Sequence, residues 1–421
     1  MMSKGYYIFN SVLVVCVAFI LGAATLTLLP IGDDTKKSLG YPADSLLNFT
    51  ELTARYGYLS EQHTVVTEDG YILTIFRIAQ GRNCKRKKKN QPVLLVHGLL
   101  QSSDSWIDSG PNSGLAYLIA DACHDIWVGN VRGNYYARRH VKYDPDKDVA
   151  FWQFSVDEIG FYDIPAMIDY VLDSTGAEKL NYIGFSQGAG AYLIMCSERP
   201  NYCDKANILI GLAPAARQTH TYSKIYRIAA NILMTMEGVL SKSGVQEVFA
   251  KGALGQEFLA FFCQLSSITV DICATGKDIF DSLNSLHPGS INNITTKVLF
   301  GHFPAGTSLH NIAKYGQSMN SARYQKFDYG KAKNLDIYGT EIPPKFNLSA
   351  VTVPVVAIYG ENDALVDIKD IDWLLKRLPN VVEAHVVKDP LWNHLDMSYS
   401  QYVSEMIFPK INHYLNINNS V

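Results

Sequence analysis

A serine between two glycines is the part of the chain whose residue types and spacing are best suited to chemistry. Ser186 lies in the pentapeptide G-F-S-Q-G, with Gly184 two residues before it and Gly188 two residues after it. The run N-Y-I-G ends two residues before Ser186 and is interpreted as a strand, and Q-G-A-G-A-Y-L-I-M follows Ser186 as a helix that begins with small residues. A G-x-S-x-G pattern between strand and helix is typical of a nucleophile elbow, a tight turn that projects the serine hydroxyl above a sheet. Glycines are needed where strand and helix approach too closely for a Cβ atom. A structural turn with a passive serine is the alternative interpretation.

A serine hydroxyl is a poor nucleophile at neutral pH, so it needs a base to take its proton and an acid to orient that base. In chains with this kind of elbow the order is serine, then aspartate or glutamate, then histidine. Asp363 follows the apolar run V-V-A-I-Y-G, and His394 lies in the loop after V-E-A-H-V-V. The sequence therefore predicts Asp363 as the orienting acid and His394 as the base.

Other residues near these positions could compete for the two roles. Glu361 lies closer to the end of the preceding strand, and Asp367 is expected to begin the next helix. His385 is inside a predicted strand, where a packed side chain is the simpler explanation. Asp396 follows His394 too closely in sequence to be the default orienting acid.

Acyl transfer also requires hydrogen-bond donors for the negative charge that develops on the carbonyl oxygen. One donor is expected to be the backbone N–H of Gln187, the residue after the nucleophile. The other is expected from the loop after the strand P-V-L-L-V, where H-G-L-L places the N–H of Leu99. His97 comes too early in the chain to be the base and is expected to shape this loop. The chemistry requires no metal ion and no organic cofactor.

Strand and helix signals alternate around these residues. H-T-V-V-T-E-D-G-Y-I-L-T-I-F-R-I predicts a hairpin with its turn at residues 68–70. Continuous apolar strands are then predicted at P-V-L-L-V, D-I-W-V-G, L-N-Y-I-G-F, V-P-V-V-A-I-Y and V-E-A-H-V-V, with a helix at G-F-Y-D-I-P-A-M-I-D-Y-V-L. Such strands are typical of a mostly parallel sheet buried on both faces, whose ligand site lies beyond the carboxyl ends of the strands.

The alternation breaks between residues 217 and 345. This segment is rich in helical signals, and we interpret it as a helical cap and lid inserted between a first core part, 41–216, and a second core part, 346–415. A packed helix explains its clearest apolar stripe equally well. That stripe consists of Ile225, Ile228, Ala229, Ile232, Leu233 and Met236.

The composition and the N-terminus bear on the class of protein and its location. The chain has 421 residues, of which 48% are hydrophobic and 18% charged, with a formal net charge of −3, so we expect a globular protein without a nucleic-acid partner. Residues 1–30 hold an uncharged apolar stretch after Lys4, which predicts a signal peptide or a signal anchor and entry into the secretory pathway. The basic run from Lys85 to Lys89 is interpreted as a solvated loop.

Two further features agree with a secretory location. Glycosylation is predicted at the N-x-[ST] sites of Asn48, Asn293 and Asn347. Six cysteines lie beyond the N-terminal segment without zinc-like C-x-x-C spacing, so disulfides or buried thiols are favoured over a metal site. They are Cys84, Cys123, Cys196, Cys203, Cys263 and Cys273.

Taken together, these motifs resemble the acid lipase family of gastric and lysosomal lipases over nearly all of the chain beyond the N-terminal segment. The resemblance rests on T-E-L-T-A-R-Y-G-Y-L-S-E-Q-H, V-L-L-V-H-G-L-L-Q-S-S-D-S-W, D-I-W-V-G-N-V-R-G-N, F-W-Q-F-S-V-D-E-I-G-F-Y-D-I-P, G-F-S-Q-G, H-F-P-A-G-T-S, G-E-N-D-A-L-V and W-N-H-L-D-M. It implies an α/β-hydrolase fold with a helical cap, and hydrolysis of carboxylic esters of neutral lipids. It also implies the roles given above for Ser186, Asp363, His394, Leu99 and Gln187. The cap of the family carries a disulfide, for which Cys263 and Cys273 are the expected pair. The long N-terminal segment and the basic run depart from the family and bear on location, not on chemistry.

The expected substrate is therefore a neutral lipid ester, met at a lipid droplet or membrane interface by a monomeric enzyme. Two alternatives stay open. A short-chain esterase or thioesterase could use the same fold, and a non-catalytic lipid-binding protein could have kept it.

Overall fold

The computed structural model describes residues 32–82, 84, 91–252 and 287–418. The predicted signal segment 1–30, the basic run 85–89 and the pair Cys263 and Cys273 lie outside the described residues. Among the helices within the described ranges, none is long and apolar enough to cross a bilayer.

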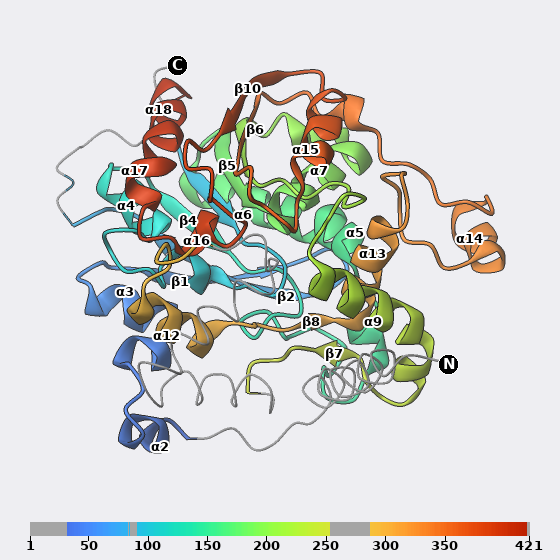
Figure 1. The fold of residues 1–421 in the computed structure, drawn as a ribbon, viewed down its shortest axis with the longest axis horizontal. Coiled ribbons are helices and arrows are strands. Elements are labelled where there is room, and N and C mark those ends of the chain that lie inside the picture. Colours follow the sequence, from blue (N-terminus) through green and yellow to red (C-terminus); the bar gives the residue numbers. More distant parts are fainter. Residues whose placement is uncertain (1–31, 83, 85–90, 253–286, 419–421) are drawn as a thin grey trace, which may run out of the picture.

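A single eight-stranded sheet forms the centre of the molecule (Figure 1), with the strand order β1-β2-β4-β3-β5-β6-β9-β10. β2 pairs antiparallel with β1 and β4, and all other neighbours pair parallel. The hairpin and the five continuous apolar strands predicted from the sequence are confirmed. The strands are β1 (Glu61–Val66), β2 (Ile72–Ile78), β3 (Val93–Val96), β4 (Ile126–Gly129), β5 (Leu180–Phe185), β6 (Ala206–Leu212), β9 (Val355–Tyr359) and β10 (Val381–Val386).

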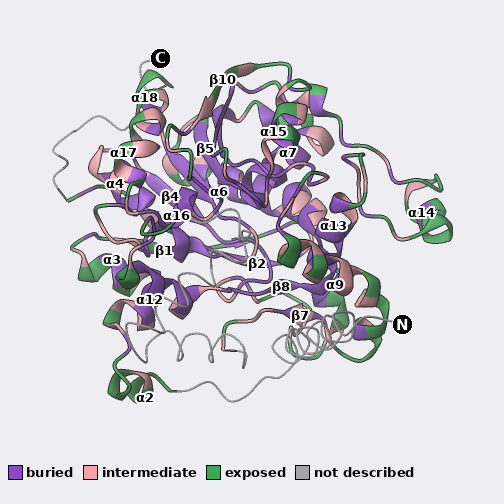
Figure 2. Cartoon of the chain, in the orientation of Figure 1, coloured by how far each residue is buried: buried purple, intermediate pink, exposed green. Residues whose placement is uncertain are grey.

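Both faces of the sheet are covered, which explains why its central strands are apolar without alternation. In β3, Val93 and Leu95 face one apolar core, whereas Leu94 and Val96 face the other, and all four are fully buried. Burying a side chain of this size contributes about 1.5–3 kcal/mol. Figure 2 shows the resulting buried centre under a more exposed outer layer of helices.

Helices α6 and α7 pack on one face, and α4 and α18 pack on the other. The predicted helix at residues 160–172 is confirmed as a π-helical turn, η4 (Ile159–Asp163), that continues into α6 (Ile164–Thr175). The other longer helices are α3 (Phe49–Arg55), α4 (Leu115–Asp121), α7 (Gln187–Glu198), α15 (Ile368–Leu375) and α18 (Phe408–Asn418). Short helical elements are α2 (Asp33–Ser38), η1 (Ala43–Leu46), η2 (Ser103–Trp106), η3 (Val149–Trp152), α5 (Val156–Glu158), α8 (Pro200–Cys203), η5 (Leu348–Ala350), α16 (Asp396–Tyr399) and α17 (Val403–Met406).

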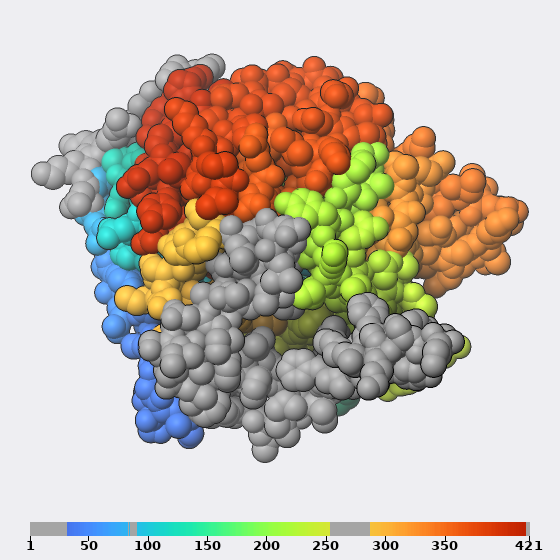
Figure 3. Space-filling view, viewed as in Figure 1, coloured from blue at the N-terminus to red at the C-terminus, as the bar shows by residue number. Residues whose placement is uncertain are grey.

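The described part of segment 217–345 is mainly helical. It contains α9 (Lys224–Lys242), α12 (Asn293–His302), α13 (Leu309–Met319) and α14 (Lys331–Tyr338), with two paired two-residue strands, β7 (Glu247–Val248) and β8 (Thr307–Ser308). α9 and α12 form part of the molecular surface next to the C-terminal segment (Figure 3).

The apolar stripe predicted on α9 is only partly buried. Ala230, Leu233 and Leu240 make the buried contacts with α13, whereas Ile225 and Ile228 are 38% and 41% exposed. The buried face is therefore rotated relative to the stripe, because α13 covers only one side of the helix.

Two features were not singled out in the sequence. The run A-N-I-L-I-G-L forms the buried strand β6 between β5 and β9. Disulfides join Cys84 to Cys123 and Cys196 to Cys203, with Cα–Cα distances of 5.4 and 4.8 Å. The sequence favoured disulfides in general but did not indicate these pairings.

Candidate active site

The turn around Ser186 joins β5 to α7 at the centre of the sheet. Ser186 has φ 49° and ψ −112°, a positive φ that side chains with a Cβ atom rarely adopt. A Cβ on Gly184 would lie 2.5 Å from the Ala189 nitrogen, and one on Gly188 would lie 2.3 Å from the Val96 carbonyl oxygen. Both glycines are therefore required by close backbone approach, the first within the turn and the second between α7 and β3.

Three side chains from distant parts of the chain meet at this turn. His394 Nε2 lies 2.9 Å from Ser186 Oγ, and His394 Nδ1 lies 2.7 Å from Asp363 Oδ2. Ser186 is 6% exposed, His394 5% and Asp363 1%, so the hydrogen-bonded chain is shielded from bulk water. The structure thus brings together the three residues that the sequence predicted as nucleophile, base and acid.

The carboxylate of Asp363 determines which ring nitrogen of His394 carries the proton. Its Oδ1 accepts hydrogen bonds from the N–H groups of Leu365 (2.9 Å) and Val366 (2.8 Å) in the turn after β9. This arrangement aims Oδ2 at His394, where it accepts the Nδ1 proton. His394 Nε2 is then the acceptor that faces the serine hydroxyl, as proton abstraction requires.

The competing residues have other surroundings. Glu361 is exposed, and Asp367 caps α15 by accepting from the Lys369 N–H at 2.8 Å. His385 lies in β10, with its Nδ1 3.5 Å from Glu383.

Asp396 contacts neither ring nitrogen of His394 but supports the loop that carries it. Its Oδ2 accepts from the Asn393 N–H (2.8 Å) and lies 2.6 Å from His287 Nδ1, while its Oδ1 accepts from Ser290 Oγ (2.6 Å). The role of Asp396 was not predicted, because His287 and Ser290 are more than a hundred residues away in sequence.

The loop after β3 lies beside the elbow and is held in an unusual conformation. Leu100 has a φ of 61°, and its carbonyl accepts from the Ala305 N–H at 2.7 Å. The Gly98 N–H donates to Gln101 Oε1 at 2.9 Å. Within the described part of the chain, no acceptor pairs with the Leu99 N–H. Gln187 is the first residue of α7, where backbone N–H groups have no acceptor inside the helix. Both predicted donors are thus positioned in segments that border the serine.

His97 ties the same loop to the turn after β4. Its Nδ1 donates to the Gly98 carbonyl (2.8 Å), and its Nε2 accepts from the Val131 N–H (3.3 Å) and from Asn134 Nδ2 (3.1 Å). Burial lowers the pKa of His97 to about 4, so the ring is neutral at neutral pH, as its accepting nitrogen requires. This agrees with the loop-shaping role expected from the sequence.

The three predicted glycosylation sites are exposed. Asn48 and Asn347 use their side-chain oxygens to cap α3 and η5, and Asn293 is the first residue of α12.

Comparison with known proteins gives the family. A model described as the alpha/beta hydrolase fold matches residues 91–398, and one described as a partial alpha/beta-hydrolase lipase region matches residues 49–110. The chain is 39% identical to Lipase 1 of Drosophila melanogaster, over 87% of this chain and 79% of that protein. It is 34% identical to gastric triacylglycerol lipase of Bos taurus, over 87% of this chain and 91% of the relative, and 34% identical to that of Homo sapiens, over 87% and 90%.

A solved structure supports the fold alone. An acetylester hydrolase from Corynebacterium glutamicum superimposes with a TM-score of 0.50 at 15% identity, covering 89% of this chain and all of that one (100%). The two disulfides, together with the gastric lipase relatives, indicate the secretory pathway. The sheet order, the matched models and the identity to gastric lipases over most of both chains lead to one assignment: this chain belongs to the acid lipase family of the α/β-hydrolases.

Proposed function

We propose that this chain is a serine lipase that hydrolyses carboxylic esters of neutral lipids, triacylglycerols or cholesteryl esters, through an acyl-enzyme. The observation that carries the proposal is the continuous hydrogen-bonded path from Asp363 through His394 to Ser186, at 2.7 and 2.9 Å.

The reaction proceeds in two halves. His394 Nε2 takes the proton of the Ser186 hydroxyl as Oγ attacks the ester carbonyl carbon. The N–H groups of Leu99 and Gln187 stabilise the negative charge that develops on the carbonyl oxygen. His394 then gives its proton to the departing alcohol as the ester C–O bond breaks. In the second half a water molecule loses a proton to His394 and attacks the acyl carbon. The bond between the acyl carbon and Ser186 Oγ then breaks, His394 returns its proton to Oγ, and the fatty acid leaves.

We propose that residues 217–345 form the cap over this site, between core parts 41–216 and 346–415. Three contacts support it. Leu99 and Leu100 pack against the apolar cluster of α9 and α13, the Ala305 N–H donates to the Leu100 carbonyl, and the Gln187 side chain contacts α13. The apolar side chains beside Leu99 favour a lipid ester over a small polar ester.

We propose the location from other features, namely the two disulfides, the gastric lipase relatives and the apolar N-terminal segment. The enzyme is secreted or lysosomal, carries glycans on Asn48, Asn293 and Asn347, and acts as a monomer at a lipid droplet or membrane interface. A membrane-anchored form is produced if the apolar N-terminal segment is retained, and partial N-terminal sequencing of the mature protein distinguishes the two forms.

Ser186→Ala tests the assignment of the nucleophile. We expect kcat on a long-chain ester to fall on the order of 10⁶-fold, as in other serine hydrolases. A fluorophosphonate should label the wild-type chain and not the variant. Preserved hydrolysis by Ser186→Ala would refute the mechanism, and an unlabelled wild type would favour a non-catalytic lipid-binding protein. A preference for short-chain over long-chain esters would instead favour the short-chain esterase.

A further inference from the structure

The side chain of Gln187, the residue after the serine, is held by two residues of α13. Gln187 Oε1 accepts a hydrogen bond from Asn311 Nδ2 at 2.9 Å and one from the Tyr315 hydroxyl at 3.1 Å. Asn311 and Tyr315 are four residues apart, so they lie on one face of the helix a turn apart. All three side chains are buried. Gln187 is therefore fixed at both ends, by the elbow at its backbone and by α13 at its amide.

The α13 helix is itself firmly anchored at this position. Ser308 Oγ accepts from the Asn311 N–H at 2.9 Å, and Asn311 Nδ2 also donates to Thr307 Oγ1 at 3.1 Å. On the next turn Lys314 Nζ lies 3.2 Å from Asp157 of α5.

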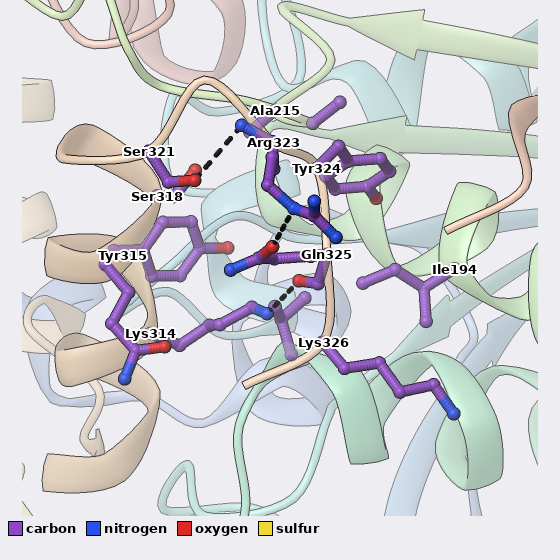
Figure 4. A pocket seen from close by; sticks show the side chains of 13 residues that line it. Ile194, Ala215, Lys314, Tyr315, Ser318, Ser321, Arg323, Tyr324, Gln325 and Lys326 are labelled. Atoms are coloured by element: carbon purple, nitrogen blue, oxygen red, sulfur yellow. Dashed lines mark hydrogen bonds between the residues drawn. The ribbon is translucent and has the colours of Figure 1, made fainter. Parts of the chain in front are cut away.

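Tyr315 also lies beside a small cavity. Figure 4 shows Lys314 and Tyr315 pointing from the helix towards the loop of residues 321–326, where both line a cavity of about 20 Å³. A cavity of this size holds about one water molecule, and the Tyr315 side chain beside it is only 5% exposed.

We propose that Asn311 and Tyr315 are positioning residues that aim the backbone N–H of Gln187 at the oxyanion. The inference rests on the proposed function, in which that N–H is one of two donors. A donor of this kind must lie about 2.7–3.1 Å from the oxygen of the transition state, so a small displacement of Gln187 weakens it. Without its two partners the buried amide oxygen would be unsatisfied, and the side chain would move to find new partners. That movement would pull on the first residue of α7. The helical segment thus supplies part of the catalytic geometry of the core.

The test uses two variants and a matched control. Asn311→Leu keeps the size of the side chain and removes its donor, and Tyr315→Phe deletes a single oxygen and leaves the ring packing intact. Tyr338→Phe is the control, because the Tyr338 hydroxyl donates to the Phe327 carbonyl at 2.9 Å within the same helical segment, and Tyr338 is not part of the apolar cluster beside Leu99. Each protein is assayed on an ester and on its thionoester, in which sulfur replaces the carbonyl oxygen.

Removing one oxyanion donor costs about 10² to 10³ in rate, and misplacing it costs less, so we expect kcat to fall about tenfold in Asn311→Leu and severalfold in Tyr315→Phe. KM should change by less than about twofold, because the interaction belongs to the transition state. Sulfur accepts hydrogen bonds weakly, so hydrolysis of the thionoester depends little on these donors. The ratio of kcat on the ester to kcat on the thionoester should therefore fall by the same factor as kcat on the ester. Tyr338→Phe should leave kcat and this ratio unchanged.

Two results would overturn the inference. One is an unchanged kcat in both variants. The other is a loss of kcat with an unchanged preference for the ester over the thionoester, which would indicate a general structural effect. If Asn311→Leu does not fold, Tyr315→Phe alone decides between these outcomes. Fluorophosphonate labelling of Ser186 in the wild type distinguishes failure of this inference from failure of the proposed function. The label requires the nucleophile and its base, whatever side chains hold Gln187.

Discussion

Asp363→Asn is expected to abolish most of the activity by reversing the protonation of His394. Asp363 Oδ1 accepts from the backbone N–H groups of Leu365 and Val366, and Oδ2 accepts from His394 Nδ1. An asparagine amide has one oxygen and one NH₂ group for these two positions. If the NH₂ group faced the two backbone donors, both buried N–H groups would lose their acceptor, at about 1–3 kcal/mol each.

The amide oxygen will therefore take the place of Oδ1, and the NH₂ group will face His394 Nδ1. The imidazole must then carry its proton on Nε2, where it can donate to Ser186 but cannot accept the serine proton. The opposite orientation of the amide, with its oxygen facing His394 Nδ1, would allow proton abstraction. It costs about 2 kcal/mol or more and is therefore populated to a few per cent at most. The stabilisation of the imidazolium by a carboxylate is lost as well, so we expect kcat to fall by about 10⁴, as the same change does in other Ser-His-Asp triads.

The assay is the steady-state hydrolysis of a long-chain chromogenic ester, with kcat and KM measured separately. The matched control is Asp367→Asn, four residues further along, where asparagine caps a helix about as well as aspartate. The control should retain full activity and an unchanged urea midpoint. If Asp363→Asn kept more than about a tenth of the wild-type kcat, the tautomer argument would be wrong.

Two further predictions concern the packing and the protonation around the loop after β3. Gly188→Ala places a Cβ 2.3 Å from the Val96 carbonyl oxygen, so we expect the free energy of unfolding to fall by about 2 kcal/mol or more and activity to be lost. Gly238→Ala is the control, because a Cβ there has no atom within 4 Å, and its free energy of unfolding should rise by about 0.5–1 kcal/mol. Urea denaturation measures both, and equal midpoints for Gly188→Ala and wild type would contradict the contact. The second prediction uses the pKa of His97, about 4 in the folded chain against 6.5 for an unperturbed histidine. The contribution of the His97 side chain to the free energy of unfolding is fully present above pH 6.5. It is lost as the pH falls towards 4, by about 3 kcal/mol in total. The difference in unfolding free energy between wild type and His97→Gln should therefore decline over that range, and a flat difference would show that His97 titrates normally.

Local sequence signals predicted the elements that carry the proposed catalytic residues, because those signals reflect burial that any fold of this class imposes. Residues 93–96 and 355–359 are apolar throughout because both faces of their strands are covered. The tight turn around Ser186 was predicted for a related reason: Gly184 and Gly188 are required by backbone contacts that can be anticipated from a strand that turns directly into a helix. β6 carries an equally clear apolar run and could have been found in the same way.

The remaining features depend on contacts between distant segments, for which one sequence holds no local signal. Asn311 and Tyr315 look like ordinary polar residues of an amphipathic helix until Gln187 is placed beside them. The same holds for the support of Asp396 by His287, and for the disulfide partners of the described cysteines. The exposure of Ile225 and Ile228 also follows from tertiary structure, since it depends on which side of α9 is covered by α13.

The backbone conformation of Ser186 has a cost for the stability of the fold. A non-glycine residue at φ 49° and ψ −112° raises the energy of the folded state by about 1–3 kcal/mol, and glycine would relieve most of it. Glycine at this position would therefore favour the folded state and at the same time remove the hydroxyl that the proposed reaction needs. Stability and activity make opposite demands on this one residue.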